Sequence, residues 1–181
     1  DWWHAALRTF RLDAGGWTPM QSLPLGVRPL AVSADAQGRV IALLEDGQIR
    51  SSSGTIMPPD TKHAWKWMAV GEHDAAPGAE LVLAARGRDV FIRAVDSPKG
   101  LWKGLSVGRG TNVMTQAAMA PVLADAAGGG RNDLAFFTGG SRTWLEIFSA
   151  SGVSADTAVL TLEESPLAVT PADIDGDGVR E

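Results

Sequence analysis

Residues 30–50 read L-A-V-S-A-D-A-Q-G-R-V-I-A-L-L-E-D-G-Q-I-R and contain short apolar runs separated by polar, glycine-containing links. Apolar runs of this length between turn residues are typical of β-strands, and the compact link Glu45-Asp46-Gly47 is typical of a hairpin turn. The stretch therefore predicts a strand, a loop, a second strand, a turn and a third strand. Because this unit recurs along the chain, it indicates a repeat architecture.

The loop of this unit has three further copies downstream. A-D-I-D-G-D-G-V-R-E at residues 172–181 aligns without a gap with A-D-A-A-G-G-G-R-N-D at residues 124–133, and a weaker copy, G-E-H-D-A-A-P-G-A-E, lies at residues 71–80. A short apolar segment precedes each copy, and a predicted hairpin follows the copies at 71–80 and 124–133. A fourth strand fits in each linker, around residues 101–107 and 158–162. The repeat predicts four antiparallel strands per unit.

Radial stacking of such sheets is the β-propeller architecture. We predict an all-β fold with about three full blades and a partial blade at both ends, as part of a larger propeller. The predicted boundaries place a partial blade at residues 1–26, blades at 27–66, 67–117 and 118–165, and the start of the next blade at 166–181. Residues 112–120 fit a short helix and a strand equally well.

Composition excludes several classes of function. The chain has 181 residues, a formal net charge of −5 and no basic run, so we expect no nucleic-acid partner. Its apolar stretches fall far short of the roughly 18 residues that cross a bilayer, so we expect no membrane span. The absence of cysteine excludes thiolate catalysis and zinc-thiolate sites. No nucleophile elbow or phosphate-binding loop is present, and we expect a non-catalytic protein.

The form D-x-D-G-D-G-x-x-E at residues 173–181, with its copies, resembles the loop between the first two strands of FG-GAP or VCBS repeat blades, as in integrin-α-like propellers. The resemblance implies a propeller, usually of seven blades, with calcium in the loops of some blades. It also implies an extracellular or periplasmic location, which agrees with the scarcity of free calcium in the cytosol.

The loop at 173–181 is the strongest candidate metal site. Calcium prefers hard oxygen ligands, and glycines let a backbone curl around an ion. We expect the ligands to be the side chains of Asp173, Asp175, Asp177 and Glu181 and the main-chain carbonyl of Val179. An EF-hand or dockerin loop and an unoccupied acidic turn remain alternatives, although Pro166 and Pro171 argue against a preceding helix.

The other loops have fewer acids. Glu72, Asp74 and Glu80 form a second, weaker candidate metal site, with Ala76 and Pro77 at its centre. In the loop at 125–133, Ala127, Gly128 and Gly129 replace the central acids, which predicts a metal-free turn. His4, His63 and His73 share no spacing typical of a zinc site, and we expect exposed or loop histidines.

Tryptophans are the remaining candidates for function. Trp67 and Trp144 lie in strand-like alternation and are expected to fill the space between blades. Trp2 and Trp3 are adjacent in a strand-like terminus, so they point to opposite faces and are our candidates for a partner contact. The sequence predicts a non-catalytic interaction or adhesion scaffold with a protein or glycan partner. The alternatives are a lectin or the glycan-binding propeller of a polysaccharide lyase or hydrolase.

Overall fold

The computed structural model describes residues 6–60, 62–73, 78–85, 89–96, 103–106, 116–117, 121–125, 132–139, 144–148 and 172–174. Within these ranges the regular structure is β-strand throughout and every strand pairing is antiparallel, which confirms the all-β prediction. The strands are β1 (Ala6–Asp13), β2 (Gly16–Pro24), β3 (Pro29–Ala34), β4 (Val40–Leu44), β5 (Ile49–Ser51), β6 (Gly54–Met57), β7 (Trp65–Gly71), β8 (Glu80–Ala85), β9 (Asp89–Ala94), β10 (Lys103–Ser106), β11 (Gln116–Ala117), β12 (Val122–Ala124), β13 (Asp133–Gly139) and β14 (Trp144–Phe148).

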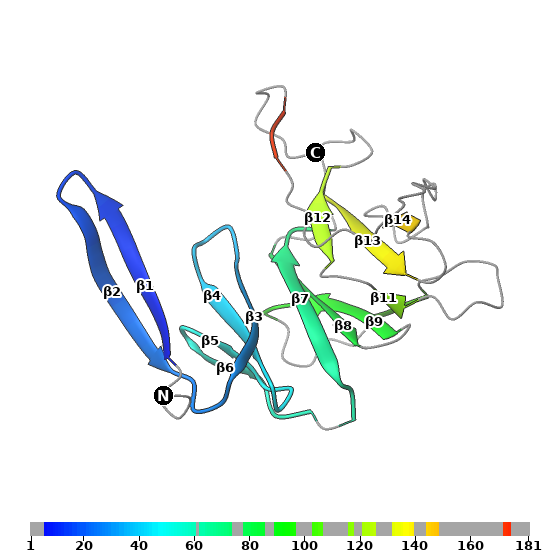
Figure 1. Cartoon of the computed structure of the whole chain (residues 1–181), viewed down its shortest axis with the longest axis horizontal. Coiled ribbons are helices and arrows are strands. Elements are labelled where there is room, and N and C mark those ends of the chain that lie inside the picture. The colour runs from blue at the N-terminus through cyan, green and yellow to red at the C-terminus, as the bar shows by residue number, and fades with distance from the viewer. Residues whose placement is uncertain are drawn as a thin grey trace.

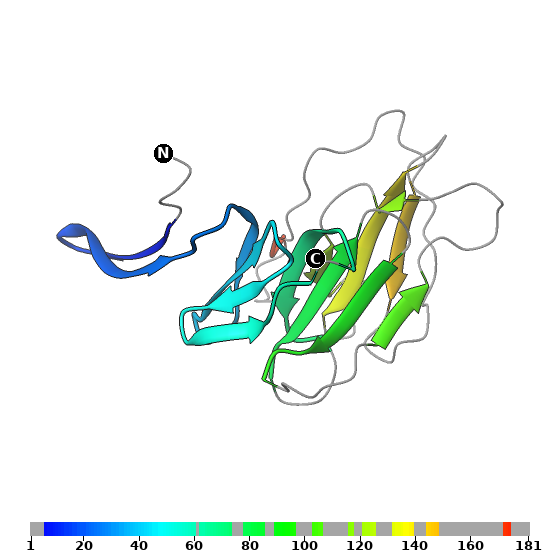
Figure 2. The same ribbon diagram turned by 90° about the horizontal axis from the view of Figure 1, so that it is seen from below.

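The strands form four sheets that follow one another in chain order. β1 and β2 form a two-stranded hairpin, β3 to β6 form the second sheet, β7 to β10 the third, and β11 to β14 the fourth. In the second and third sheets each strand pairs with the next one along the chain. The hairpin lies at one end of the row and the fourth sheet at the other (Figures 1 and 2).

The predicted turns lie where the sequence placed them. The link at Glu45-Asp46-Gly47 joins β4 to β5, and the Gly47 amide donates to the Leu44 carbonyl at 2.9 Å. Gly47 has a φ of +78°, which glycine adopts without steric cost. β8 and β9 flank residues 86–88, and β13 and β14 flank residues 140–143, so these pairs are hairpins as predicted.

The first strand of the fourth sheet is interrupted. β12 pairs with β13 at Val122↔Ala135, and β11 pairs with β13 at Ala117↔Thr138. β14 also pairs with residues 134–138 of β13, so β11 and β12 share the other edge of that strand. Four residues, 118–121, lie between β11 and β12, but only two residues of β13, 136 and 137, lie between their partners. The four include Pro121, which has no N–H to donate. β11 lies in the segment that fitted a helix and a strand equally.

Two strands start earlier than the predicted unit boundaries. β7 begins at Trp65 and β11 at Gln116, each two residues before the predicted starts at 67 and 118. β11 therefore belongs to the fourth sheet although it lies in the second of the three predicted full blades. The predicted fourth strand around 158–162 lies outside the described residues.

The sheets pack face to face, and β8 shows how. All six of its residues are buried, and successive side chains point to opposite faces of a strand. Leu81 and Leu83 join a core cluster with Ile41 and Leu43 of the second sheet. Val82 and Ala84 join a separate cluster with Leu134 of the fourth sheet. The third sheet is therefore covered on both faces by its neighbours.

The first strands of successive sheets lie beside one another. β3 contacts β7, and β7 contacts β12. At the end of β7, a Cβ atom on Gly71 would lie 2.9 Å from Cδ1 of Leu123, so a glycine permits this close approach. Each of the four sheets is open within the described residues, and β3, β7 and β12 form one row across the stack.

Candidate cation loops

Three loops join a first strand to a second strand. They are residues 35–39 between β3 and β4, residues 72–79 between β7 and β8, and residues 125–132 between β12 and β13. Two contacts join the second and third of them. Asn132 Nδ2 donates to the Glu72 carbonyl at 2.9 Å, and His73 Nδ1 lies 3.0 Å from the Asn132 carbonyl. Described residues of the second and third loops are therefore in direct contact.

The shortest loop is closed by its own acid. Asp35 is buried, and its Oδ1 accepts the main-chain N–H groups of Gln37 at 3.1 Å and Arg39 at 2.8 Å. The main chain adds two bonds, from the Asp35 amide to the Arg39 carbonyl and from the Gly38 amide to the Asp35 carbonyl. A carboxylate that receives backbone N–H groups in this way replaces the hydrogen bonds that a tight turn leaves unmade.

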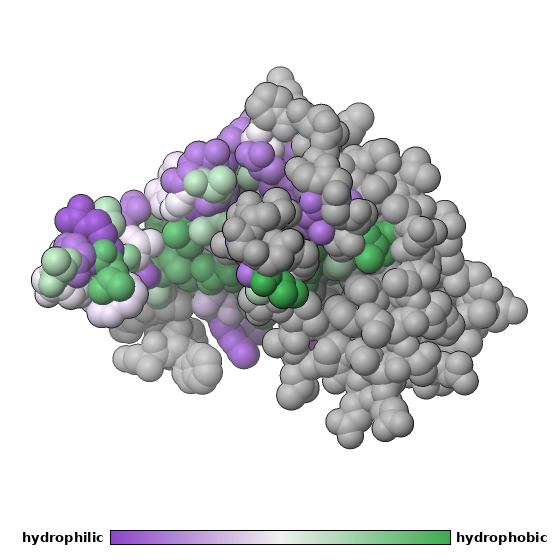
Figure 3. Space-filling view, turned by 90° about the horizontal axis from the view of Figure 1, so that it is seen from above, coloured by the Kyte–Doolittle hydropathy of each residue, from purple (hydrophilic) through white to green (hydrophobic). Residues whose placement is uncertain are grey.

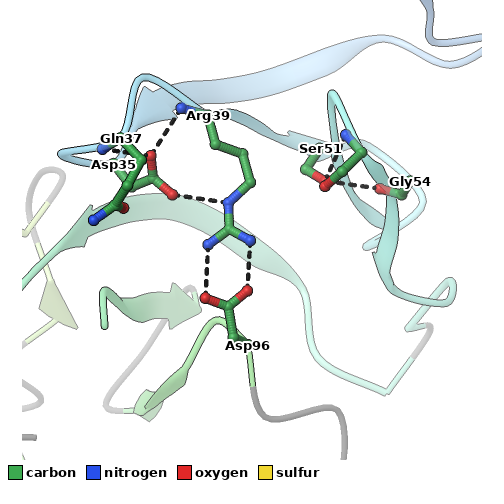
Figure 4. A network of polar contacts seen from close by, with 7 residues as sticks. Asp35, Gln37, Arg39, Ser51, Gly54 and Asp96 are labelled. Carbon is green, nitrogen blue, oxygen red and sulfur yellow. Dashed lines mark hydrogen bonds and ion pairs between the residues drawn. The ribbon is translucent and has the colours of Figure 1, made fainter. Parts of the chain in front are cut away.

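A guanidinium supplies the positive charge of this loop. Arg39 Nε lies 2.8 Å from Oδ2 of Asp35, and its two terminal nitrogens bind both carboxylate oxygens of Asp96, which follows β9 in the third sheet (Figure 4). The hydrogen bond to Asp96 is the main reason that the pKa of Arg39 is raised, and it also lowers the pKa of Asp96. Arg39 therefore links a loop of the second sheet to the third sheet.

The contact between Arg39 and Asp96 was not predicted from the sequence. Its only local signal is the alignment of A-D-A-Q-G-R with A-D-I-D-G-D, where Arg39 stands at the position of an acid, Asp177. The loop therefore has a fixed cation of its own at this position. Its partner, Asp96, is 57 residues away along the chain, and no spacing rule connects the two.

The loop between β7 and β8 is held by the carboxylate of Glu80, the first residue of β8. Glu80 is buried, and its Oε2 accepts the main-chain N–H of His73 at 2.6 Å. His73 is also buried, and because a carbonyl oxygen only accepts, its Nδ1 donates to Asn132. Of the predicted weaker metal ligands, Glu72 and Glu80 lie at the two ends of this loop, and Asp74 lies outside the described residues.

The two acids that frame the loop between β12 and β13 are both buried. They are Asp125, which directly follows β12, and Asp133, which begins β13. The residues between them up to Arg131 lie outside the described ranges, so the metal-free turn stays a prediction. Asp133 is a buried acid at the start of a second strand, as Glu80 is at the start of β8.

Of the five candidate ligands in the strongest candidate loop, one is described. Asp173 is exposed, and Asp175, Asp177, Val179 and Glu181 lie outside the described residues. The chemistry of this donor set, four carboxylates and one carbonyl, fits the hard oxygen ligands that calcium prefers. Among the described residues no group of three or more His, Asp or Glu side chains is placed to hold a metal ion.

A separate polar cluster surrounds Asp60, between β6 and β7. Its carboxylate binds the ring of His63 at 2.9 Å, the indole N–H of Trp65 at 3.1 Å and the amide of Lys62 at 2.9 Å. Burial alone would raise the pKa of Asp60, but the hydrogen bonds outweigh burial and lower it. The ring of His63 stacks on that of Trp65, with 4.7 Å between centroids. The cluster fixes the connection between the second and third sheets.

The predicted aromatic contacts are described in part. Trp2 and Trp3 lie outside the described residues, and Trp67 packs against the cluster between the third and fourth sheets. The exposed aromatic side chains of the described residues are instead Phe10 and Trp17, on the hairpin. These two residues, which lie in β1 and β2, were not predicted from the sequence as candidates for function.

Comparison of the sequence with family models and with curated proteins finds no match to either. The resemblance to FG-GAP or VCBS repeats therefore rests on the loop residues and on the repeat. The described residues contain no helix that is long and apolar enough to cross a membrane.

Proposed function

We propose that this chain is part of a calcium-supported β-propeller of FG-GAP or VCBS type that acts as a non-catalytic interaction or adhesion scaffold outside the cytosol. The observation that supports this proposal most strongly is the row of first strands, in which β3 contacts β7 and β7 contacts β12. Sheets of sequentially paired strands that stack through their faces and meet along their first strands are the repeating element of a propeller.

The calcium site is the loop at residues 173–181. Its role is structural: an ion among four carboxylates removes their mutual repulsion and fixes the connection that follows the first strand of the next blade. The other loops close by different means, since Arg39 neutralises Asp35 and the carboxylate of Glu80 accepts a main-chain N–H. The proposal therefore assigns one tight calcium ion to this chain, which native mass spectrometry before and after chelation measures directly.

An interaction role is distinguished from catalysis by an assay on polysaccharides. The chain is incubated with neutral and acidic polysaccharides in calcium, and new reducing ends and unsaturated products are measured. The proposal predicts none above a heat-denatured control. Calcium-dependent product formation would overturn the non-catalytic assignment and favour the alternative of a lyase or hydrolase.

A further inference from the structure

The hairpin contains the last two strand positions of a sheet. In the second and third sheets, the third strand pairs on both edges: β5 with β4 and β6, and β9 with β8 and β10. The hairpin comes directly before β3 along the chain, just as β5 and β6 come directly before β7. β1 is therefore equivalent to the third strand of a sheet, the place that β5 and β9 take. Within the described residues, however, β1 pairs only with β2. β5 uses one edge to pair with β4, and β9 uses the same edge to pair with β8. The corresponding edge of β1 has no partner strand within the described residues.

The two edges of the hairpin differ in a way that agrees with this position. β2 contains Pro19 and Pro24, and proline lacks the N–H that a neighbouring strand would need. Prolines of this kind protect the natural edge of a sheet. β1 has eight residues and no proline, so its backbone is able to pair along its length.

One face of β3 is also bare. Ala31 packs into the cluster between the second and third sheets, which covers one face of the strand. Leu30 and Val32 point to the other face and are 39% and 50% exposed. β7 is the comparison, because Met68 and Ala69 pack into the clusters on its two opposite faces. The first strand of a preceding sheet would cover Leu30 and Val32 as β3 covers one face of β7.

The hairpin touches the second sheet near its base and at one point further along, where Gln21 Nε2 donates to the Ser52 carbonyl at 3.5 Å. Leu7 and Leu23 pack against Ala42 and Leu44. Further along, a groove of about 650 Å³ separates the hairpin from the second sheet. On the hairpin side the groove is lined by Thr9 and Gln21, which lie on the same face as Leu7 and Leu23, and on the other side by Val40 and Ser52. Apolar surface lies on the hairpin and in the recess beside it (Figure 3).

The outer face of the hairpin is apolar. The register pairs Phe10 with Pro19 and Leu12 with Trp17, on the face opposite to Leu7 and Leu23. Phe10, Leu12 and Trp17 are 50%, 62% and 69% exposed. An apolar row on a strand pair with an open edge is a feature of an incomplete sheet, since the third sheet, which has its four strands, buries both faces.

We propose that the open edge of β1 and the bare face of β3 together accept one antiparallel pair of β-strands from a further repeat, of the kind formed by β7 and β8. The first strand of that pair covers Leu30 and Val32, and the second pairs with β1 and completes a four-stranded sheet. Main-chain hydrogen bonds supply affinity and the apolar contacts fix the register. The inference rests on the proposed repeat arrangement and is independent of calcium.

A graft tests this inference in the full chain. Residues 65–88, which contain β7, β8 and the link to β9, replace residues 1–5, so that Ala6 follows Arg88 of the graft. At this junction Leu7 takes the position that Val90 has after Arg88 and Asp89. Val90 belongs to the third sheet and faces the fourth sheet, as Leu7 faces the second. We expect amide exchange in β1 to slow by about tenfold or more relative to the unmodified chain. The measurement is made with calcium chelated, so that it does not depend on the cation loop.

The matched control is the same graft with Trp67→Lys and Ala69→Lys in the grafted copy of β7, whose originals face the next sheet, so that charges lie against Leu30 and Val32. Equal exchange rates of β1 in graft and control would overturn the proposal. Protection of β1 in the unmodified chain, together with a dimeric mass, would also overturn it, because a second copy would then cover this surface. Unchanged exchange in β13, whose sequence the graft does not duplicate, reports that the rest of the chain stays folded. If β13 exchanges faster, the peptide 65–88 is added in trans and β1 exchange is measured again.

Discussion

Arg39 Nη2 lies 3.1 Å from Oδ2 of Asp96, and Arg39 Nε lies 2.8 Å from Oδ2 of Asp35. A single guanidinium thus joins the buried acid of its own loop to an exposed acid of the next sheet (Figure 4). The two acids are unequal, because a charge in a buried site depends on its partner more than a charge in water does.

Arg39→Ala is predicted to destabilise the fold by about 1–3 kcal/mol, because it leaves the buried carboxylate of Asp35 with main-chain donors only. Asp96→Ala is the matched variant at the exposed end of the same ion pair, and it is expected to cost about 0–1 kcal/mol. Urea unfolding of the two variants measures the difference. An equal or larger loss for Asp96→Ala would show that the inter-sheet contact, and not the loop, depends on Arg39.

Asp60 is predicted to make stability depend on acid pH. Its hydrogen bonds hold its pKa below the usual value of 3.8 when folded, so between the two pKa values the folded chain binds fewer protons than the unfolded chain. Stability from this group is present above the unfolded pKa and is lost as pH falls through the folded pKa. Urea unfolding from about pH 6 to about pH 3 should show a shallower loss for Asp60→Asn. Parallel profiles for variant and parent would contradict this assignment.

Gly47→Ala is predicted to destabilise the turn between β4 and β5 by about 1–3 kcal/mol. Its φ of +78° strains an alanine, and a Cβ at this position would run into the main-chain carbonyl of Asp60. Gly26 has a similar φ of +71° and nothing within 4 Å of its Cβ position, so Gly26→Ala isolates the cost of the φ angle. Thermal unfolding compares the two, and equal losses would mean that the contact with Asp60 relaxes freely.

Leu83→Ala is predicted to cost about 2–5 kcal/mol, because Leu83 is fully buried between the second and third sheets. Leu12→Ala makes the same chemical change at an exposed position of the hairpin and is expected to stay within about 0.5 kcal/mol. Chemical denaturation measures both. A large loss for Leu12→Ala would show that the outer face of the hairpin is already covered in solution.

The strands and turns were predictable because their signals are local. Alternating apolar residues around Glu45-Asp46-Gly47 placed β4 and β5, and the repeat of the loop placed the second strands β8 and β13. The interruption between β11 and β12 was not predicted, because the short segment before Pro121 fits a strand and a helix equally well.

The contacts of the loops were less predictable, because they join residues far apart in sequence. The approach of Arg39 to Asp96 depends on the stacking of two sheets, and no local pattern encodes it. The burial of His73 has the same origin, since Asn132 of the neighbouring sheet covers it. By contrast, the acids of the loop at 173–181 were found from their spacing alone, and their role in calcium binding stays a prediction.

The most direct test of the account is calcium titration by calorimetry, with the melting temperature measured in parallel, on the parent chain and on Asp175→Ala, Asp177→Ala. The control, Glu163→Ala, Glu164→Ala, removes the same charge outside the loop. A calcium ion in this loop predicts binding and a raised melting temperature in parent and control, with both effects lost in the loop variant. No binding by the parent chain, or unchanged binding by the loop variant, would contradict the assignment of a structural calcium ion to residues 173–181.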